Sequence, residues 1–435
     1  FRLSLTTHEN PPLREEESDV PATIVAAINT PADKRSDTQQ RQLADYYRRE
    51  AAEFADRRKQ LTDVKKQLAD LEKSFPEVMV MSQRNQPRET FVLKVGQYDQ
   101  PDRNGPASPN TPAVLPLLPE DKSHDRLALA QWLVDPAHPL TARVTVNRIW
   151  QHHFGTGLVK TTEDFGVQGE RPSHPELLDW LAVHFIESGW NVKQLHKLIV
   201  MSATYQQSSA MTPDLRERDP ANRLLARGPR FRLSSFAIRD QALSLAGILV
   251  EKVGGEPVKP YQPPGVWDDF SLGKIKYQRD TGEKLYRRSL YTFWRRSVAP
   301  TTLFDTANRL VCDVRPRRTN TPLHALTTLN DEAFVEAARL FAERMMVEGG
   351  DSPEDRIRWA FRLATSRKPS DDETAILLRS WERANERFTS DEESAKQLLS
   401  VGEKRRNEEL PAAGLAAYTS IANMLLNLDE VLTRE

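Results

Sequence analysis

The chain has 435 residues, which is too long for one hydrophobic core and predicts two to three structural units. Its 61 basic and 62 acidic side chains give a formal net charge of -1, so overall charge does not favour nucleic acid or an anionic membrane as a partner. A single cysteine, Cys312, excludes an intramolecular disulfide and argues against a thiolate metal cluster.

The amino terminus lacks the basic and apolar pattern of a signal peptide. No apolar run reaches the ~20 residues that a membrane-spanning helix needs, so we expect no membrane span. The first residues, Phe1 to Thr7, alternate like the end of a strand whose partners are missing. This pattern suggests that the chain was cut or processed from a larger protein.

Residues 1–122 are predicted to form a connector that begins with a helical hairpin. Its two helices are expected at Ala22 to Asn29 and at the charged stretch Thr38 to Lys73. Two short β-like runs follow at 78–81 and 89–93, and the proline-rich stretch Pro101 to Pro119 is expected to be an extended linker. The second helix carries a narrow apolar seam spaced by three and four residues: Leu61, Val64, Leu68 and Leu71.

Residues 123–435 are predicted to form a mainly α-helical domain, a multi-helix orthogonal bundle with a small β element. N-caps are expected at Thr141, Ser173, Asn191 and Ser234 or Ser235. Tyr286 to Arg296 alternates, which predicts a strand. Apolar spacing predicts helices at 125–134, 141–154, 174–188, from 192 onward, at 235–250, from 331 onward, and at 354–364, 371–388 and 413–426.

The densest group of polar and aromatic residues lies in the predicted helix Arg143 to Phe154. His152 and His153 are adjacent, so they point about 100° apart on a helix and do not suit one metal ion, which favours i and i+4 spacing. We therefore expect no metal site. A histidine on an apolar helix face is usually a satisfied core residue. The weak catalytic candidates are Asp164, His174 and Asp240, for which caps and ion pairs are simpler explanations.

A local excess of positive charge marks the stretch Lys284 to Arg318, which holds nine Lys or Arg against two Asp. Arginines interleaved with aromatic rings suit planar anions, through bidentate hydrogen bonds and stacking. The alternative is that these arginines pair with nearby acids. An aromatic loop at 261–267 could stack on a sugar or anchor itself to the core. The candidate ligand-binding residues are Asn147, Arg148, Tyr261, Trp267, Arg287, Arg288, Tyr291, Trp294, Arg315 and Asn320.

Several motifs together resemble a known family. They are Arg143-Val-Thr-Val-Asn-Arg-Ile-Trp150, Phe154-Gly-Thr-Gly157, Ser173-His-Pro-Glu-Leu-Leu-Asp-Trp180, Ser202-Ala-Thr-Tyr-Gln-Gln-Ser-Ser209, Leu285-Tyr-Arg-Arg-Ser-Leu-Tyr-Thr-Phe-Trp294 and Arg318-Thr-Asn-Thr-Pro322. Over residues 123–435 the chain resembles the planctomycete-type C-terminal domain of unknown function, found in secreted proteins with a planctomycete-type cytochrome c domain. Residues 1–122 resemble the connector that precedes it.

The resemblance implies an extracytoplasmic bacterial protein, with a c-type haem domain and sometimes a lectin-like β-sandwich upstream. It implies no established reaction and no catalytic residue. The chain contains no haem-attachment motif, P-loop, G-x-G-x-x-G or G-x-S-x-G, so we expect no cofactor within it. Polysaccharide handling is suggested only by the domains that accompany this family.

The leading hypothesis is an extracytoplasmic module that binds a glycan or other anionic ligand and serves a larger, possibly haem-bearing protein. The site would be built mainly by Tyr286 to Arg318, with the polar edge of the helix at Asn147. One alternative is an enzyme acting on polysaccharide, either a hydrolase using Asp and His or an oxidoreductase coupled to the upstream haem. Another is a structural scaffold. The expected partners are a glycan and the upstream domains, with no nucleic acid.

Overall fold

The computed structural model describes residues 20–84, 86, 88–118, 124–268, 276–295, 298–300, 302–306, 311–315 and 317–434. The chain divides into two compact units, residues 1–107 and 108–435. The predicted mainly α-helical fold is confirmed, with one small antiparallel sheet among the described residues. No helix in the described part of the chain is both long enough and apolar enough to cross a membrane.

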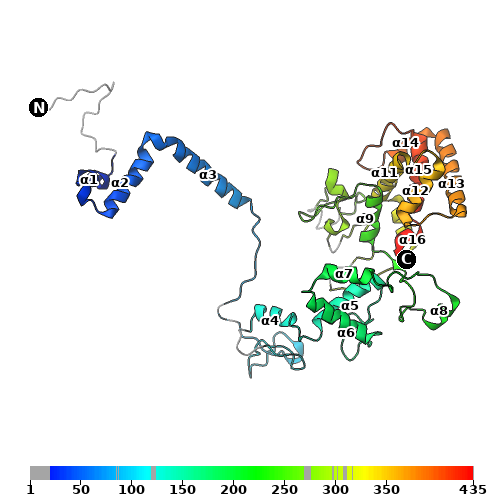
Figure 1. Cartoon of the computed structure of the whole chain (residues 1–435), viewed down its shortest axis with the longest axis horizontal. Coiled ribbons are helices and arrows are strands. Elements are labelled where there is room, and N and C mark those ends of the chain that lie inside the picture. Colours follow the sequence, from blue (N-terminus) through cyan, green and yellow to red (C-terminus); the bar gives the residue numbers. More distant parts are fainter. Residues whose placement is uncertain are drawn as a thin grey trace. The chain divides into compact units, whose positions relative to one another are not determined.

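The first unit contains α1 (Ala22–Asn29), α2 (Asp37–Glu50) and α3 (Ala55–Ser74) (Figure 1). The predicted hairpin is formed by α1 and α2, joined by Arg35, whose Nε donates to the carbonyl oxygens of Ala27 and Thr30 at 3.0 and 2.9 Å. The predicted long helix is wrong, because Ala51 is extended (φ -62°, ψ 133°) and separates α2 from α3. A 3-10 turn, Ala52–Phe54, follows the break.

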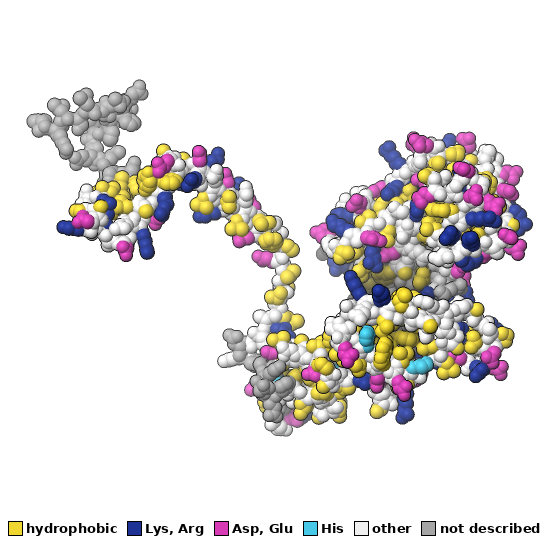
Figure 2. All heavy atoms as spheres, viewed as in Figure 1, with side chains coloured by type: hydrophobic (Ala, Val, Ile, Leu, Met, Phe, Trp, Pro, Cys, Tyr) yellow, Lys and Arg dark blue, Asp and Glu magenta, His cyan; other side chains and the backbone are white. Residues whose placement is uncertain are grey.

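The apolar seam predicted on the second helix lies on α3, and it is exposed. Leu61, Val64, Leu68 and Leu71 are each between 54% and 59% exposed. Figure 2 shows hydrophobic side chains on the surface of this helix. The strands predicted at 78–81 and 89–93 are wrong: the described residues there are irregular, apart from one bridge between Leu93 and Pro101. Alternation alone forms no strand unless a neighbouring strand pairs with it.

The second unit begins before residue 123, because residues of the proline-rich stretch pack against its first helix, α4 (Arg126–Leu133). The indole Nε1 of Trp132 donates to the Pro116 carbonyl oxygen, and Nδ1 of His124 lies 2.8 Å from the Pro109 carbonyl oxygen. Leu118 is buried. The first compact unit ends at residue 107, within the predicted connector.

Three helices, α5 (Thr141–Phe154), α6 (Pro175–Glu187) and α7 (Val192–Val200), lie side by side around one core (Figure 1). The cap at Asn191 is confirmed, since its Oδ1 accepts from the Gln194 amide at 3.0 Å. The caps predicted at Thr141 and Ser173 are wrong. The buried face of this bundle contains Val146, Ile149, Trp150, Phe154, Leu178, Leu181, Phe185, Leu195 and Ile199.

The two wrong caps have different causes. Thr141 is the first residue of α5 and not its cap, because Nδ1 of His138 accepts from the Thr141 amide at 3.2 Å. Ser173 does not cap α6, because its hydroxyl donates to the Leu158 carbonyl oxygen at 3.3 Å and so holds the loop that follows α5. His174 stands at the start of α6 without a side-chain capping bond.

The middle of the unit contains α8 (Pro213–Arg218), β1 (Phe231–Arg232) and α9 (Ser235–Leu245), the last capped by Ser234 as predicted. The strand predicted at Tyr286 to Arg296 is wrong. One 3-10 turn, Gly282–Tyr286, ends at its first residue and a second, Ser289–Tyr291, lies inside it, with isolated bridges at Arg287 and Thr292. Arg296 lies outside the described residues.

A second helical bundle has α11 (Glu332–Glu348) and α15 (Ala412–Leu426) at its centre. The predicted stripe on α11 is confirmed, with Phe334, Ala338, Phe341 and Met345 at most 2% exposed. Small buried residues such as Ala337 and Ala416 let the two helices approach closely. Around them lie α10 (Pro322–Asn330), α12 (Pro353–Thr365), α13 (Asp371–Ser390), α14 (Glu392–Leu399) and α16 (Asp429–Leu432).

The short sheet connects the middle of the unit to its last described residues. β1 pairs antiparallel with β2 (Thr433–Arg434), with Phe231 opposite Arg434 and Arg232 opposite Thr433. Arg434 also donates to the carbonyl oxygen of His153 on α5, and its guanidinium lies 3.9 Å from the centre of the Tyr205 ring. The end of the chain therefore contacts the α5 to α7 bundle.

Candidate functional site

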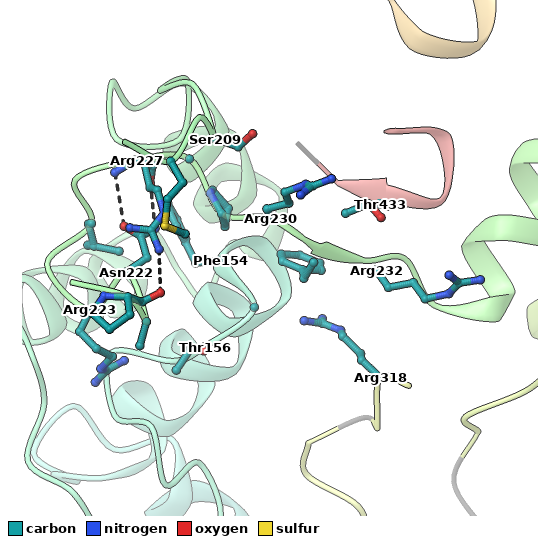
Figure 3. A pocket seen from close by; sticks show the side chains of 18 of the residues that line it. Phe154, Thr156, Ser209, Asn222, Arg223, Arg227, Arg230, Arg232, Arg318 and Thr433 are labelled. Atoms are coloured by element: carbon teal, nitrogen blue, oxygen red, sulfur yellow. Dashed lines mark hydrogen bonds between the residues drawn. The ribbon is translucent and has the colours of Figure 1, made fainter. Parts of the chain in front are cut away.

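The described part of the second unit contains a cleft of about 1000 Å³ (Figure 3). It lies where the end of α5, the chain around β1 and the last described residues come together. Its lining is polar and rich in arginine, and its segments are far apart in sequence: 154–158, 208–211, 220–232, Arg318, Asn320, Asp429 and Thr433.

Gly155 lets two of these segments approach each other. It ends α5 with φ +77°, a conformation that favours glycine. A Cβ atom at this position would lie 2.8 Å from Cδ1 of Phe231 and 3.3 Å from Nη1 of Arg318. The Phe231 ring therefore packs against the glycine, and the Arg318 guanidinium lies over that ring at 4.0 Å from its centre.

Two arginines build one wall of the cleft and are satisfied by backbone oxygen atoms. Arg227 donates to the carbonyl oxygens of Asp219 and Pro220 at 2.9 and 2.8 Å. Arg223 donates to the carbonyl oxygens of Gly157 and Leu158 at 2.8 and 3.0 Å. Because both Nη atoms of each guanidinium already donate to backbone oxygen atoms, we assign both arginines to the structure of the wall.

The other three arginines lie at the opposite side of the cleft, around β1 (Figure 3). Arg230 forms an ion pair with Asp429. Arg232 donates from Nη1 to Asn320 Oδ1 at 2.9 Å, while its Nε is buried without a hydrogen-bond partner. Arg318 forms no ion pair with any described residue. Burial lowers the pKa of both Arg232 and Arg318, since their charge is partly removed from water.

The remaining lining combines aromatic rings with small polar groups. The rings of Trp150 and Phe154 stack at 4.1 Å between centres. Thr156 and Ser209 add hydroxyl groups (Figure 3). Among the described residues that line the cleft, Asp429 is the only carboxylate, and it is paired with Arg230. The arrangement has a positive excess and suits a negatively charged ligand.

The structure does not bring most of the predicted ligand-binding residues to this cleft. Asn147 is fully buried and exchanges two hydrogen bonds with the Val159 backbone, at 2.9 and 3.0 Å. The Tyr261 hydroxyl donates to Glu336 Oε2 at 2.9 Å in the core. Trp267 is 5% exposed and donates to Gln262 Oε1. The aromatic loop is therefore anchored to the core by its own rings.

The arginines predicted as ligand contacts in the stretch Lys284 to Arg318 also form contacts within the protein. Arg287 is buried, donates to three backbone carbonyl oxygens between 252 and 256, and lies 3.8 Å from the centre of the Tyr291 ring. Arg288 pairs with Asp240 at 3.6 Å, and Arg315 pairs with Glu163 at 3.2 Å. Trp294 is half-buried, and Arg148 is exposed on α5 outside the cleft. Of the predicted residues, Asn320 alone lines the cleft.

None of the weak catalytic candidates is among the residues that line the cleft, although His174 contacts Ser173, which does. Asp164 Oδ1 accepts from the Gly166 amide at 2.7 Å, within a loop. Asp240 Oδ1 accepts from the Ser289 amide at 2.7 Å, and His174 Nδ1 lies 3.0 Å from the Ser173 hydroxyl. The described residues contain no group of three His, Cys, Asp or Glu that could hold a metal ion.

The histidines of α5 belong to a packed cluster. Nε2 of His153 lies 2.8 Å from Nδ1 of His196, and its ring packs edge-on against Tyr205. Burial lowers the pKa of His153 to about 4, and the nearby His196 and Arg434 act in the same direction. His153 is therefore neutral at pH 7 and supports the packing of α5 against α7.

Sequence reasoning missed Arg230, Arg232 and Arg318 as a group. The run Leu224 to Leu233 mixes arginine with apolar residues, which is a local signal. Nothing in that run indicates that its partners lie near residues 318 and 429. Their proximity is a consequence of the tertiary fold.

The fold and the cleft define a mainly α-helical protein with an arginine-rich surface cavity. The chain belongs to the PSD1 family, described as a protein of unknown function (DUF1553), which matches residues 125–381. This confirms the domain of unknown function that the motifs predicted. Neither a curated protein nor a solved structure matches the chain significantly. Asp429 and Thr433, which line the cleft, lie beyond the matched residues.

Proposed function

We propose that the second unit binds an anionic glycan in the cleft around β1, with Arg318 as the principal contact. The main support for this proposal is the environment of Arg318. Its guanidinium is half-buried over the Phe231 ring and has no carboxylate partner among the described residues. A charge that is partly removed from water and has no partner is destabilising, and a bound carboxylate or sulfate would offset part of that cost.

The shape and lining of the cleft favour a glycan over a small inorganic anion. A volume of about 1000 Å³ accommodates several sugar rings, whereas one phosphate or sulfate would fill little of it. The hydroxyl groups of Thr156 and Ser209 suit the hydroxyl groups of a sugar. The forked guanidinium of Arg318 suits the planar carboxylate of an acidic sugar.

The placement of the carboxylates favours glycan binding over glycan hydrolysis. Glycoside hydrolysis uses two carboxyl groups, roughly 5 to 10 Å apart, across the scissile bond. Asp429 is the only carboxylate among the described residues that line the cleft, and its charge is neutralised by Arg230. Asp164 and Asp240 are engaged in backbone hydrogen bonds elsewhere. The cleft therefore supports recognition of a glycan better than its cleavage.

The cellular setting is part of the proposal and rests on the resemblance of the motifs. The module would act outside the cytoplasm, within a larger protein that carries a c-type haem upstream. In that arrangement it would hold an acidic polysaccharide close to the other domains of the same protein. No redox or hydrolytic step is assigned to this chain.

The test is a calorimetric titration of the chain with oligogalacturonate as a carboxylated probe, dextran sulfate as a sulfated probe and dextran as a neutral one. We expect at least one acidic probe to bind, to bind more weakly as salt rises, and to lose roughly tenfold or more in affinity in Arg318→Gln, since a hydrogen bond to a charged group contributes about 1.5 to 3 kcal/mol. Arg383→Gln, which removes an exposed arginine of α13, should bind as the original chain does.

Two results would overturn the proposal. One is the absence of binding by both acidic probes. The other is equal affinity of Arg318→Gln and the original chain, because Arg318 would then make no contribution to binding. Circular dichroism of each variant establishes that the helical fold is retained, and Arg318→Lys shows whether charge alone restores binding.

A further inference from the structure

Arg232 is a second arginine of the cleft that forms no ion pair with a described residue. Its Nη1 donates to Asn320 Oδ1 at 2.9 Å, but its Nη2 donates to none of the described residues. Burial lowers the pKa of Arg232, and the nearby carboxylates of Asp305 and Asp429 act in the opposite direction. The cleft therefore contains two guanidinium groups, those of Arg318 and Arg232, that no described carboxylate contacts directly.

These two guanidinium groups lie on opposite sides of β1. Phe231 and Arg232 are consecutive residues of this strand, so their side chains project to opposite faces. The Arg318 guanidinium lies over the Phe231 ring at 4.0 Å from its centre, whereas the Arg232 guanidinium lies 5.9 Å from the centre of the Phe304 ring. Figure 3 shows the side chains of Arg232 and Arg318 pointing in opposite directions. One carboxylate therefore does not bind both groups.

The segment from Arg318 to Asn320 connects the two positions. Arg318 and Asn320 contact the two consecutive residues of β1, so this segment runs beside the strand. Thr319, between them, is held by the Asp305 carboxylate, which accepts from its amide and its hydroxyl at 2.7 and 2.8 Å. Two residues of chain span at most ~7 Å. The two positions are therefore fixed by the protein and close enough for nearby residues of one bound glycan chain.

We propose that the ligand is a polyuronate and that the cleft binds the carboxylates of two of its residues, one at Arg318 and one at Arg232. This inference rests on the binding of an acidic glycan proposed above. The planar fork of each guanidinium suits a planar carboxylate. A glycan with a single acid uses only one of the two positions. Arg232 is therefore the residue that selects a chain with several acids over a chain with an isolated one.

The second contact should add substantially to the affinity. Once a carboxylate is bound at Arg318, the next acid of the same chain is held near Arg232. The second contact then forms within one complex and avoids the entropic cost of a second association. A hydrogen bond to a charged group typically corresponds to about tenfold or more in affinity. Salt should also weaken binding more steeply for a ligand that makes two charged contacts than for one that makes a single contact.

The experiment compares two forms of one trisaccharide by calorimetric titration of the full chain. One form is trigalacturonate with three free carboxylates. The other is the same trisaccharide with one free carboxylate and two methyl esters, so the sugar rings are the same and only the charged groups differ. We expect the free acid to bind at least roughly tenfold more tightly than the ester. In Arg232→Gln this ratio should fall to about threefold, since three free acids still offer three ways to occupy Arg318.

Two further variants serve as controls. Arg383→Gln removes an exposed arginine of α13 and should keep the full ratio between the two forms. Arg232→Lys keeps the charge without the planar fork and should retain part of the ratio. Circular dichroism establishes that each variant keeps the helical fold. The comparison of the two forms in the original chain needs no variant, so it tests the second contact even if Arg232→Gln does not fold.

The possible failures are distinguishable. Equal affinity of the two forms in the original chain, or a ratio that Arg232→Gln leaves unchanged, would overturn the second contact and leave the single contact at Arg318 intact. If neither form binds, the assignment of a polyuronate is wrong. Binding of dextran sulfate in the same series would then show that the cleft still binds an anionic glycan.

Discussion

Gly402 and Glu336 lie so close together that a Cβ atom on Gly402 would overlap the Glu336 carboxyl group. The Glu336 side chain is 1% exposed. It accepts hydrogen bonds from the hydroxyl groups of Tyr261 and Tyr286 at 2.9 and 3.0 Å, and from the Lys404 amide at 2.8 Å. One carboxylate on α11 thus holds three segments that are distant in sequence, and Gly402 allows the last of them to reach it.

Gly402→Ala should lower the free energy of unfolding by about 2 to 4 kcal/mol. The new methyl group would displace the Glu336 carboxylate, and the backbone at φ +94° disfavours a side chain. Urea unfolding followed by circular dichroism measures the effect. Gly414→Ala is the matched control, because its methyl group would meet only ordinary contacts at 3.7 and 3.9 Å inside helix α15. Equal stability of Gly402→Ala and the original chain would contradict the role of the contact.

Asn147→Ala should cost about 2 to 5 kcal/mol of stability, since it leaves the buried amide and carbonyl groups of Val159 without partners. The adjacent Arg148→Ala, at an exposed position of the same helix, should change stability by about 0.5 kcal/mol or less. Chemical unfolding of both variants makes the comparison. If Asn147→Ala kept full stability but lost ligand binding, the residue would belong to a site and not to the core.

His153 predicts a pH dependence of stability. Its pKa is lowered to about 4 in the folded protein, chiefly by burial, from an ordinary value of 6.5. The unfolded chain therefore takes up the proton first, so the stability contributed by neutral His153 is complete above pH 6.5 and is lost as pH falls toward 4. The neighbours His152, His196, Tyr205 and Arg434 surround the ring.

The measurement is the free energy of unfolding across pH 4 to 6.5, with His153→Gln as the comparison. We expect the slope against pH to be smaller in the variant. Histidine ring resonances followed by NMR give the pKa directly. Titration of His153 at or above its ordinary value would show that the ring is not desolvated in the manner described.

Gly155→Ala should weaken binding of the acidic probe several-fold without changing any charge in the cleft. The added methyl group would push Phe231 away from its position 2.8 Å from that site and move the Arg318 guanidinium that lies over the ring. Calorimetric titration at constant salt tests this. Gly189→Ala serves as a control for strain alone, because Gly189 also has positive φ but has open space around it. The same loss of affinity in both variants would count against a role for this contact.

Local sequence signals predicted much of the helical fold. The predicted caps at Asn191 and Ser234 were correct. In each case the side-chain oxygen accepts a hydrogen bond from the amide three residues later, so the contact needs no distant partner. The stripe on α11 was correct because apolar spacing on a buried helix is a property of the helix itself. The cap at Ser173 was wrong because its hydroxyl is used by the Leu158 carbonyl oxygen, a contact that spans 15 residues.

The candidate site was less predictable for the same physical reason. Arginine and aromatic alternation near Arg287 suggested a ligand, but the backbone carbonyl oxygens of a neighbouring loop satisfy that guanidinium. Nothing local distinguishes an arginine that finds such oxygen atoms from one that does not. Arg318 is exceptional only because the fold surrounds it with Phe231 and Gly155 and supplies no acid among the described residues.

The pairing of β1 with β2 also sets an order of events during synthesis. Phe231 leaves the ribosome about two hundred residues before its partner Arg434, so the α5 to α7 bundle can form while one side of the cleft does not yet exist. Contacts of such long sequence separation form late. The side of the cleft that Asp429 and Thr433 line is therefore completed only after the α5 to α7 bundle can have formed.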